Sequence, residues 1–234
     1  MKPTFIKNDS TLTHRSRWID IRLRDVELTL LPERAVFSTE HSALFIADTH
    51  FGKDATFRKS GLPVPAGGCK AVLDKLLELI KRTGAKQLII LGDMFHARSS
   101  LADDVLMEVN AFLQCIPNTN VKLVRGNHDR SVGKLPPDWN LEVIEPGFRI
   151  GRLVLTHEPQ PLVGADEIVL CGHLHPAVRL SGRGNDIGKL PCFWWTRGNL
   201  VLPALGKFTG SMVIEPIEND KVWIVAGDQL VPRT

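Results

Sequence analysis

The stretch Val124-Arg125-Gly126-Asn127-His128-Asp129-Arg130 places an amide, an imidazole and a carboxylate in three consecutive residues. It follows an apolar run, 121–124, that is typical of a buried strand, and Gly126 supplies the residue that most easily takes positive φ where the chain turns. The polar triplet is therefore expected on a loop at the carboxyl end of a strand, where open α/β sheets bind ligands. A surface turn has a similar composition, so this stretch alone leaves both interpretations open.

The composition favours one globular domain spanning residues 1–234. With 43% hydrophobic residues the chain can bury a sizeable core, and its net charge of +3 permits a polyanionic partner without requiring one. The four cysteines are widely spaced, which favours reduced structural residues over a disulfide framework. No apolar run approaches the ~20 residues of a membrane helix, and the amino terminus lacks a signal-peptide core. We expect a cytoplasmic protein with no membrane contact.

Hydrophobic patterning indicates two halves. In the first, alternation at 18–23 predicts a half-buried strand, with a meander continuing through 26–30 and 35–37. Continuous apolar runs at 43–47, 88–91 and 121–124 predict buried parallel strands. Between them, helical periodicity over 72–80 stops at Gly84, and a second helix is expected from an N-cap at Ser100 to about Gln114. The second half is expected to be β-rich, with short strands near 141–144, 153–156, 168–171, 193–195, 212–214 and 222–225.

Five loops, each at the predicted end of a strand, carry oxygen or imidazole side chains. A mixed oxygen and imidazole set without thiolates suits Mn, Fe or Zn and argues against a structural zinc site. Each loop alone is more often turn chemistry, but the ordered set predicts a metal centre. In chain order the loops offer Asp48 and His50, then Asp93, then Asn127 with His128 and Asp129, then His157, then His173 and His175.

Seven of these side chains are candidate metal ligands, too many for one ion with open positions. They suffice for two ions that share a bridging carboxylate. Two metals ~3.5–4 Å apart are the standard arrangement for in-line displacement at phosphorus, so cleavage of a phosphate ester is the reaction that this set fits best.

The order Asp48-x-His50, Gly92-Asp93, Gly126-Asn127-His128-Asp129, His157 and Gly172-His173-x-His175 resembles the calcineurin-like metallophosphoesterase superfamily. The resemblance implies an α/β fold: a four-layer α-β-β-α sandwich of two mixed β-sheets flanked by helices. It implies two divalent cations, with Mn²⁺ expected and Fe²⁺ or Zn²⁺ as alternatives. One cation would be held by Asp48, His50 and His175 and the other by Asn127, His157 and His173, with Asp93 bridging. His128 would be the general acid for the leaving group, oriented by Asp129.

Narrower resemblances indicate a substrate class. The block 92–100 is similar to SbcD-type DNA repair nucleases, which implies that His96 acts near the phosphate. The blocks 48–53, 61–65 and 202–210 resemble more closely the bacterial ligase-associated metallophosphoesterases called PdeM. That resemblance implies an endonuclease of the DNA damage response, with an ATP-dependent DNA ligase and a helicase as partners. The chain has no length for the DNA-capping domain of SbcD-type nucleases, so processive exonuclease action on duplex ends is not expected. The expected substrate is flexible or single-stranded DNA.

Basic residues lie in or next to the same loops, where they would form a rim for a phosphate backbone. The alternative is that they are ordinary solvated loop residues. Two other functions also remain: a phosphodiesterase or phosphatase for a small nucleotide, and a non-catalytic scaffold with the same fold, which the complete ligand set disfavours. The candidate rim consists of Lys53, Arg58, Lys59, Arg98, Arg125 and Arg130.

Overall fold

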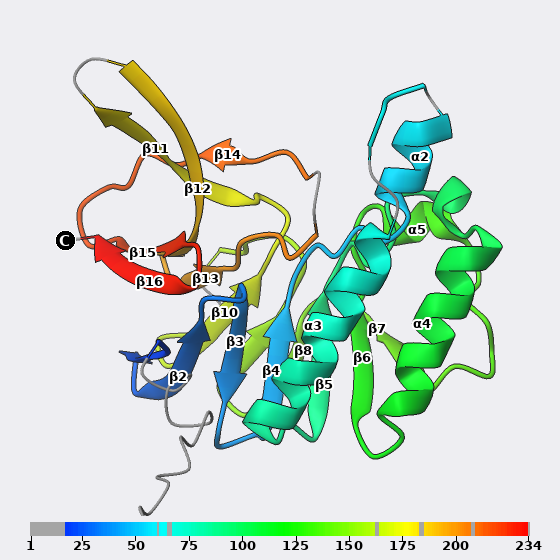
Figure 1. Cartoon of the computed structure of the whole chain (residues 1–234). Helices are drawn as coiled ribbons and strands as arrows, with labels where there is room; N and C mark the ends of the chain where they lie inside the picture. Colours follow the sequence, from blue (N-terminus) through cyan, green and yellow to red (C-terminus); the bar gives the residue numbers. More distant parts are fainter. Residues whose placement is uncertain are drawn as a thin grey trace, which may run out of the picture.

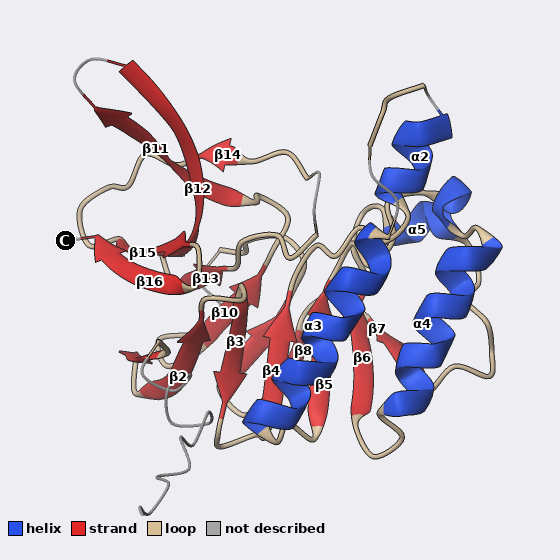
Figure 2. Cartoon of the chain, in the orientation of Figure 1, coloured by secondary structure: helices blue, strands red, loops and turns tan. Residues whose placement is uncertain are grey.

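Two β-sheets pack face to face, and helices flank one of them (Figures 1 and 2). The structure is a computed structural model that describes residues 17–59, 61–64, 67–161, 164–182, 185–206 and 209–233. The predicted sandwich of two mixed sheets is confirmed.

The first sheet has seven strands that follow one another in chain order. Its first four strands pair antiparallel, as the predicted meander requires, and the last four pair parallel. The continuous apolar runs form the parallel strands because both faces of those strands are covered. The strands are β1 (Ile19–Leu23), β2 (Val26–Leu31), β3 (Ala35–Ser38), β4 (Ala43–Ile46), β5 (Gln87–Leu91), β6 (Asn120–Val124) and β7 (Leu141–Ile144).

Two helices, α3 (Gly68–Thr83) and α4 (Asp103–Cys115), cover the outer face of this sheet (Figure 2). The apolar residues of α3 face the sheet, and the helix ends as predicted at Gly84, whose φ of 67° lets its N–H bond to the Ile80 carbonyl at 2.9 Å. Three short elements lie at the carboxyl edge of the sheet: α2 (Lys53–Lys59), the 3-10 turn η1 (Arg98–Ser100) and α5 (Asp129–Val132).

The predicted N-cap at Ser100 is wrong. Helix α4 begins at Asp103 with Ala102 as its N-cap, and Ser100 instead ends η1. Its buried hydroxyl accepts a hydrogen bond from the Ala97 N–H at 3.3 Å and faces back into the turn rather than toward the helix. Asp103 and Asp104 then supply negative charge to the first turn of α4, which favours the helix without a side-chain cap.

The second sheet is assembled mainly from the second half of the chain, in the order β14-β11-β12-β13-β10-β9-β8, with β15 pairing both β12 and β16. Its central strands β9, β10 and β13 are parallel, and hairpins extend the sheet on both sides. The strands are β8 (Phe148–Ile150), β9 (Leu153–Leu155), β10 (Ile168–Cys171), β11 (Pro176–Gly182), β12 (Asn185–Thr196), β13 (Asn199–Val201), β14 (Met212–Val213), β15 (Lys221–Ala226) and β16 (Gln229–Arg233).

The helices of the described residues all lie before residue 133, so within this part of the chain no helix covers the outer face of the second sheet. Four of the connections in this sheet, β8–β9, β11–β12, β12–β13 and β15–β16, are antiparallel hairpins, which need no helical crossover. A small apolar cluster of Val154, Val169, Cys171 and Val201, with Trp194 packed against it, covers this face instead.

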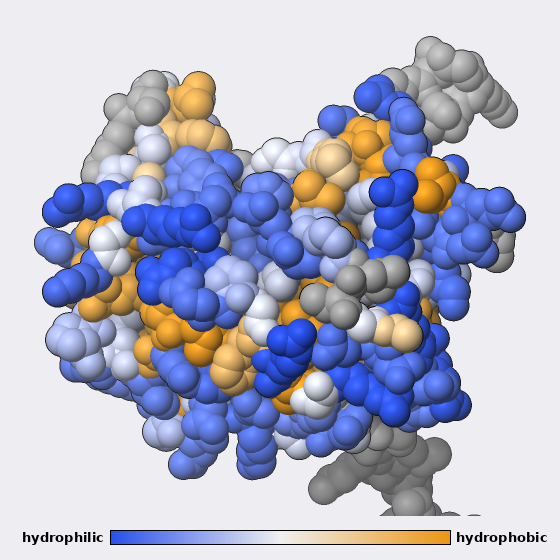
Figure 3. Space-filling model, turned by 180° about the vertical axis from the view of Figure 1, so that it is seen from behind, coloured by the Kyte–Doolittle hydropathy of each residue, from blue (hydrophilic) through white to orange (hydrophobic). Residues whose placement is uncertain are grey.

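None of the described helices has the length and apolar character needed to cross a membrane. Seen from behind, the surface is a mosaic of hydrophilic residues and smaller hydrophobic patches (Figure 3). The same view shows the surface hollowed between two projections. Figure 1 places α2 on one side of this hollow and the β11–β12 hairpin on the other.

The main core lies between the two sheets. Phe45, Leu30 and Ile89 from the first sheet and Phe193 and Leu170 from the second are fully buried there in one cluster. Such large side chains hold the sheets in a fixed relative position, because interiors are packed nearly as densely as organic crystals.

We expect Phe45→Ala to lower the free energy of unfolding by ~3–5 kcal/mol, because it leaves a cavity between the sheets. Met107→Ala is the matched control, since this side chain is 66% exposed on α4, and its effect should stay within about 0.5 kcal/mol. Urea unfolding followed by circular dichroism measures both. Equal effects would mean that the inter-sheet core does not limit stability.

Candidate metal centre and active site

The predicted ligand loops meet at one edge of the sandwich. Strands β4, β5 and β6 are parallel neighbours in one sheet, and β9 and β10 are parallel neighbours in the other, so their carboxyl ends carry the five loops to the same place. In these loops five residues have left-handed φ values, at a cost of ~1–2 kcal/mol each for side chains with a Cβ. Such strain persists where the surroundings enforce it and is common at functional sites. The residues are Asp48 (54°), His50 (43°), Asp93 (51°), His173 (68°) and His175 (48°).

Asp48, His50 and His175 form a first ligand group. One donor atom from each lies within 4.8 Å of the others, and Asp48 Oδ1 is 3.4 Å from His175 Nε2. Asp48 and His50 are buried, and the backbone of this loop is tied to the β5 loop by the His50 N–H, which donates to the Asp93 carbonyl at 3.0 Å.

Asp93, His157 and His173 form a second ligand group with the same spacing of donor atoms. Asn127 Oδ1 adds a fourth donor, 2.8 Å from His157 Nε2 and 3.2 Å from His173 Nδ1. Asp93 Oδ2 lies 3.4 Å from His157 Nε2 and 3.8 Å from His50 Nε2. The Asp93 carboxylate therefore stands between the two groups, where the resemblance puts a bridging ligand.

Backbone carbonyls orient two of the imidazoles. His157 Nδ1 is 3.0 Å from the Leu91 carbonyl oxygen, and His175 Nδ1 is 2.9 Å from that of Gly210. Because a carbonyl oxygen only accepts, each Nδ1 must carry the hydrogen. That tautomer leaves the Nε2 lone pair for the cluster, as is usual for metal-ligating histidines.

Several polar atoms of the cluster have no hydrogen-bond partner in the described part of the chain and could instead bind cations. Asp48 Oδ1 and both ring nitrogens of His50 are buried without a hydrogen-bond partner among the described residues, which is costly unless a ligand satisfies them. Burial lowers the pKa of His50 to about 3, so its ring is neutral, the form that binds metal. For His157, burial acts downward but Asp93 and Asp48 outweigh it and raise the pKa to about 9, which marks the strong negative potential of the site.

Three glycines give the cluster its room. A Cβ at Gly92 would lie 2.1 Å from His157 Nδ1, one at Gly126 would lie 2.3 Å from Asp93 Oδ1, and one at Gly172 would lie 2.3 Å from Asp48 Oδ2. The expected positive φ at Gly126 is wrong, since only Gly92 of the three has one. The requirement at Gly126 is close approach to a neighbouring carboxylate, not a special turn.

The Asp129 carboxylate makes no hydrogen bond to the His128 imidazole among the described residues, contrary to the role that the resemblance implies. Its buried carboxylate accepts hydrogen bonds from the N–H groups of Gly126, Asp93, Met94 and Phe95, at 2.9, 2.8, 3.0 and 3.5 Å. Asp129 therefore fixes the β6 loop to the β5 loop. Asp129 is the first residue of α5, and from this position its side chain reaches the N–H groups of the β5 loop.

The His96 carbonyl takes the orienting part instead. It lies 2.7 Å from His128 Nδ1, so that Nδ1 carries a hydrogen and Nε2 faces the cluster, 3.9 Å from Asp93 Oδ2. The His96 ring stacks on that of His128 with centroids 5.1 Å apart and meets the ring of His50 edge-on at 5.6 Å. The structure thus brings His96 into the site, as the sequence predicts.

Of the predicted basic rim, Lys53 is the residue most closely coupled to the cluster. Its side chain is half-buried, burial lowers its pKa, and its charge acts on Asp93 and His50. Arg98 and Arg130 are exposed nearby, on η1 and α5. The side chain of Lys59 lies outside the described residues. A phosphate-binding role for these four stays a prediction.

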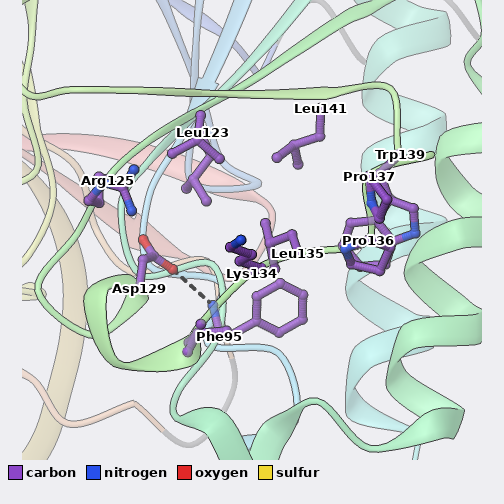
Figure 4. A pocket seen from close by; sticks show the side chains of 13 residues that line it. Phe95, Leu123, Arg125, Asp129, Lys134, Leu135, Pro136, Pro137, Trp139 and Leu141 are labelled. Carbon is purple, nitrogen blue, oxygen red and sulfur yellow. Dashed lines mark hydrogen bonds between the residues drawn. The ribbon is translucent and has the colours of Figure 1, made fainter.

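The two other rim candidates are engaged with acids. The Arg58 guanidinium lies 3.2 Å from the Asp54 carboxylate within α2, and Arg125 Nε donates to Glu145 at 2.8 Å. Arg125 also lines a mainly apolar pocket of about 350 Å³ behind Asp129, where Trp139 stacks on Phe95 (Figure 4). Arg125 therefore pairs with Glu145 and lines the pocket behind the ligand loops.

The segment after β13 supports the site in a way that no sequence pattern indicated. The Leu205 N–H donates to the Ala47 carbonyl at 2.9 Å, and the Gly206 N–H donates to that of Asp48 at 3.0 Å. A Cβ at Gly206 would lie 2.4 Å from the Thr49 carbonyl oxygen, so this glycine permits the contact. The signal that could have revealed it was the Gly206 within the block 202–210.

The comparisons with known proteins agree with this geometry. The sequence pattern that defines calcineurin-like phosphoesterases matches residues 41–194, more than half of the chain. The chain belongs to this family. It is therefore a metal-dependent phosphoesterase, and the superfamily expected from the loop motifs is confirmed.

Among solved structures, the nuclease MPE of Pseudomonas putida is similar over 92% of this chain and 100% of its own, with 33% identity and a TM-score of 0.80. The E. coli phosphoesterase YfcE matches 80% of this chain and 88% of its own at 18% identity and a TM-score of 0.39. A protein of unknown function from Aquifex aeolicus matches 62% of this chain and 82% of its own, at 19% identity and a TM-score of 0.40. None of the curated proteins matches this phosphoesterase.

Gly172→Ala should lower the metal content of the purified protein and cost ~1–3 kcal/mol of stability, because the added methyl displaces the Asp48 carboxylate. The control is Gly164→Ala, whose Cβ would meet only the mobile end of the Glu167 side chain. Elemental analysis and thermal unfolding report the two effects. Full metal content in Gly172→Ala would show that Asp48 is not needed where the structure places it.

Asp129→Asn should lower the free energy of unfolding by ~1–3 kcal/mol, because an amide nitrogen cannot accept from the N–H groups that the carboxylate now satisfies. Asp138→Asn, at an exposed position, is the control. If Asp129→Asn leaves the free energy of unfolding unchanged but greatly lowers kcat, Asp129 acts in catalysis rather than in stability.

Proposed function

We propose that this phosphoesterase is a dinuclear nuclease that cleaves phosphodiester bonds in flexible or single-stranded DNA. The observation that carries the proposal is the pair of ligand groups that meet at Asp93, with His128 beside them. Asp48, His50 and His175 would hold one divalent cation. His157, His173 and Asn127 would hold the other, with Asp93 shared between them. Bound there, the cations supply an acidified water as nucleophile and neutralise charge on the phosphoryl oxygens.

The chain's own residues then handle the proton of the leaving group. His128 Nδ1 is fixed by the His96 carbonyl, so only Nε2 is free to exchange a proton, and it faces the centre of the cluster. When the ring is protonated, Nε2–H can donate to the oxygen that departs from phosphorus. The stacked His96 ring holds the plane of His128, and the half-buried Lys53 adds positive charge for the phosphate.

DNA as the substrate rests on two supports. The Pseudomonas putida structure is that of a nuclease and covers nearly the whole of this chain. Figure 3 shows the outline of the molecule notched between two projections, which Figure 1 identifies with α2 and the β11–β12 hairpin, and a polymer substrate could lie in this hollow. We extend the proposal to DNA damage repair, to Mn²⁺ as the metal, to a DNA ligase and a helicase as partners, and to the cytoplasm as the location.

The deciding experiment compares substrates. Mn²⁺-loaded protein is incubated with single-stranded and duplex oligonucleotides and, separately, with a panel of cyclic and linear mononucleotides. We expect higher kcat/KM on single-stranded DNA, and loss of nearly all turnover in Asp93→Asn, which lacks the shared charge. Preference for a mononucleotide would replace the nuclease by the small-nucleotide phosphodiesterase, and retained turnover in Asp93→Asn would show that Asp93 is not the bridge.

His128→Asn should slow the cleavage of a poor leaving group, such as a deoxyribose alkoxide, by ~10²–10⁴-fold, the usual contribution of a general acid. Release of p-nitrophenolate, which needs no proton, should slow far less. The two rates are compared on an oligonucleotide and on bis-p-nitrophenyl phosphate, with metal content checked in both proteins. Equal slowing would indicate an electrostatic role for His128.

A further inference from the structure

A second pocket adjoins the candidate metal centre on the side of the second sheet. It has a volume of about 300 Å³, and His175 belongs both to its lining and to the first ligand group. Two basic residues, Arg34 from the turn between β2 and β3 and Lys189 from β12, line it together with the hydroxyl residues Thr209 and Ser211. No acidic residue is among the described residues of its lining.

Arg34 is the unusual member of this lining. Its side chain is half-buried, and one guanidinium nitrogen donates to the Ala204 carbonyl at 2.9 Å, but no carboxylate pairs with it in the described part of the chain. Burial lowers its pKa, with no acid acting against this effect. Arg82, also half-buried, instead pairs with Glu33 at 2.8 Å.

A guanidinium that is partly removed from water without a counter-charge is destabilising, and a bound anion would offset that cost. The planar group has five N–H donors, and the bond to Ala204 uses a single direction, so donors remain for a phosphate. Arg34 itself sits at a φ of 67° in a turn closed by its N–H and the Leu31 carbonyl at 3.0 Å, which fixes where the side chain starts.

We propose that this pocket binds the phosphate next to the one being cleaved, with Arg34 as its principal ligand and Lys189 as a second cation. The proposal rests on the proposed nuclease function and deepens it, because it makes the substrate a chain of at least two phosphates rather than a mononucleotide. Because His175 belongs both to this pocket and to the first ligand group, two neighbouring phosphates of one strand would occupy the two sites. Thr209 and Ser211 offer hydroxyl donors to the same anion.

A purely structural role for Arg34 is the competing account, since its bond to Ala204 ties the β2–β3 turn to the segment that supports Asp48. The two accounts differ in what they predict for a substrate that lacks charge at the flanking position. If Arg34 binds the flanking phosphate, replacing Arg34 should no longer affect cleavage once that phosphate is neutral. If Arg34 has only a structural role, replacing it should slow the cleavage of every substrate equally.

The test uses Arg34→Met and Arg34→Lys in the full chain, with Arg152→Met as a charge-matched control. Arg152 is exposed and immediately precedes β9, at the end of that strand opposite to His157. Each protein is assayed on an oligonucleotide with one cleavable bond, on the same oligonucleotide with neutral methylphosphonates on either side of that bond, and on bis-p-nitrophenyl phosphate. Fluorescence anisotropy of a labelled, uncleavable oligonucleotide measures binding without turnover.

We expect Arg34→Met to raise KM and Kd for the charged oligonucleotide about tenfold or more, the loss of a charge-assisted hydrogen bond, with a smaller change in kcat. The neutral-flank substrate should show no such difference between Arg34→Met and the unaltered protein, Arg34→Lys should restore part of the affinity, and Arg152→Met should match the unaltered protein. Equal losses of activity on all three substrates would show that Arg34 has a purely structural role and would overturn the proposal.

Inorganic phosphate separates a substrate subsite from a site for a free anion. If the pocket serves the substrate, phosphate should compete with the charged oligonucleotide, and Arg34→Met should weaken that competition. Phosphate inhibition that depends on Arg34 but is equally strong on the neutral-flank substrate would indicate a regulatory anion site and overturn the assignment. Should the unaltered protein cleave no oligonucleotide at all, the nuclease function itself would fall, whatever the Arg34 variants show.

Discussion

The buried Asp129 carboxylate is the interaction on which the site depends. It accepts hydrogen bonds from the N–H of Gly126 in the loop after β6 and from those of Asp93 and Met94 in the loop after β5. These bonds hold the ends of β5 and β6 in one arrangement. The same loops carry Asp93, Asn127 and His128, whose mutual distances are thus set by a residue that contacts none of the reacting atoms. Backbone N–H groups can be satisfied by water or by a carboxylate, but only the carboxylate fixes two loops to each other.

Around this link the chain accepts local costs. Five candidate ligands adopt left-handed backbone conformations, and Asp48 Oδ1 and both ring nitrogens of His50 are buried without a hydrogen-bond partner in the described part of the chain. Three glycines keep the space into which neighbouring carboxylates and an imidazole project. These features lower the stability of an isolated chain and have a physical reason only if cations and an anionic substrate complete the site. The large inter-sheet core, with Phe45 and Phe193 at its centre, provides the compensating stability.

The two sheets contribute unequally to recognition. The first supplies the Asp93 and Asn127 loops, the short helix α2 and Lys53, and the second supplies His157, His173, His175 and the wall that contains Lys189. The site therefore forms only when the sheets pack together. A substrate lying in the hollow would contact both, with the Arg34 pocket on one side of the metal centre and Lys53 on the other as candidate phosphate contacts.

The sequence by itself determined the candidate metal ligands and most of the strands that carry them. Apolar runs that end in Asp, Asn or His identify strand ends whatever the rest of the chain does, because strand burial and loop polarity are local properties of composition. Hence the parallel strands β4, β5 and β6, the end of α3 at Gly84 and the family were all predicted correctly, whereas β7, expected in the β-rich second half, pairs with β6 in the first sheet. Only the tertiary structure decided which partner each side chain meets. Asp129 accepts hydrogen bonds from backbone N–H groups rather than from His128, and Gly126 is needed for space rather than for a positive φ. Ser100 ends a 3-10 turn instead of capping α4, and Arg58 and Arg125 pair with acidic side chains. Arg34 lines the pocket beside the site although it lies in a turn far away in the sequence. These outcomes depend on which loops become neighbours when two sheets pack, and that information is spread over the whole chain and absent from any single motif.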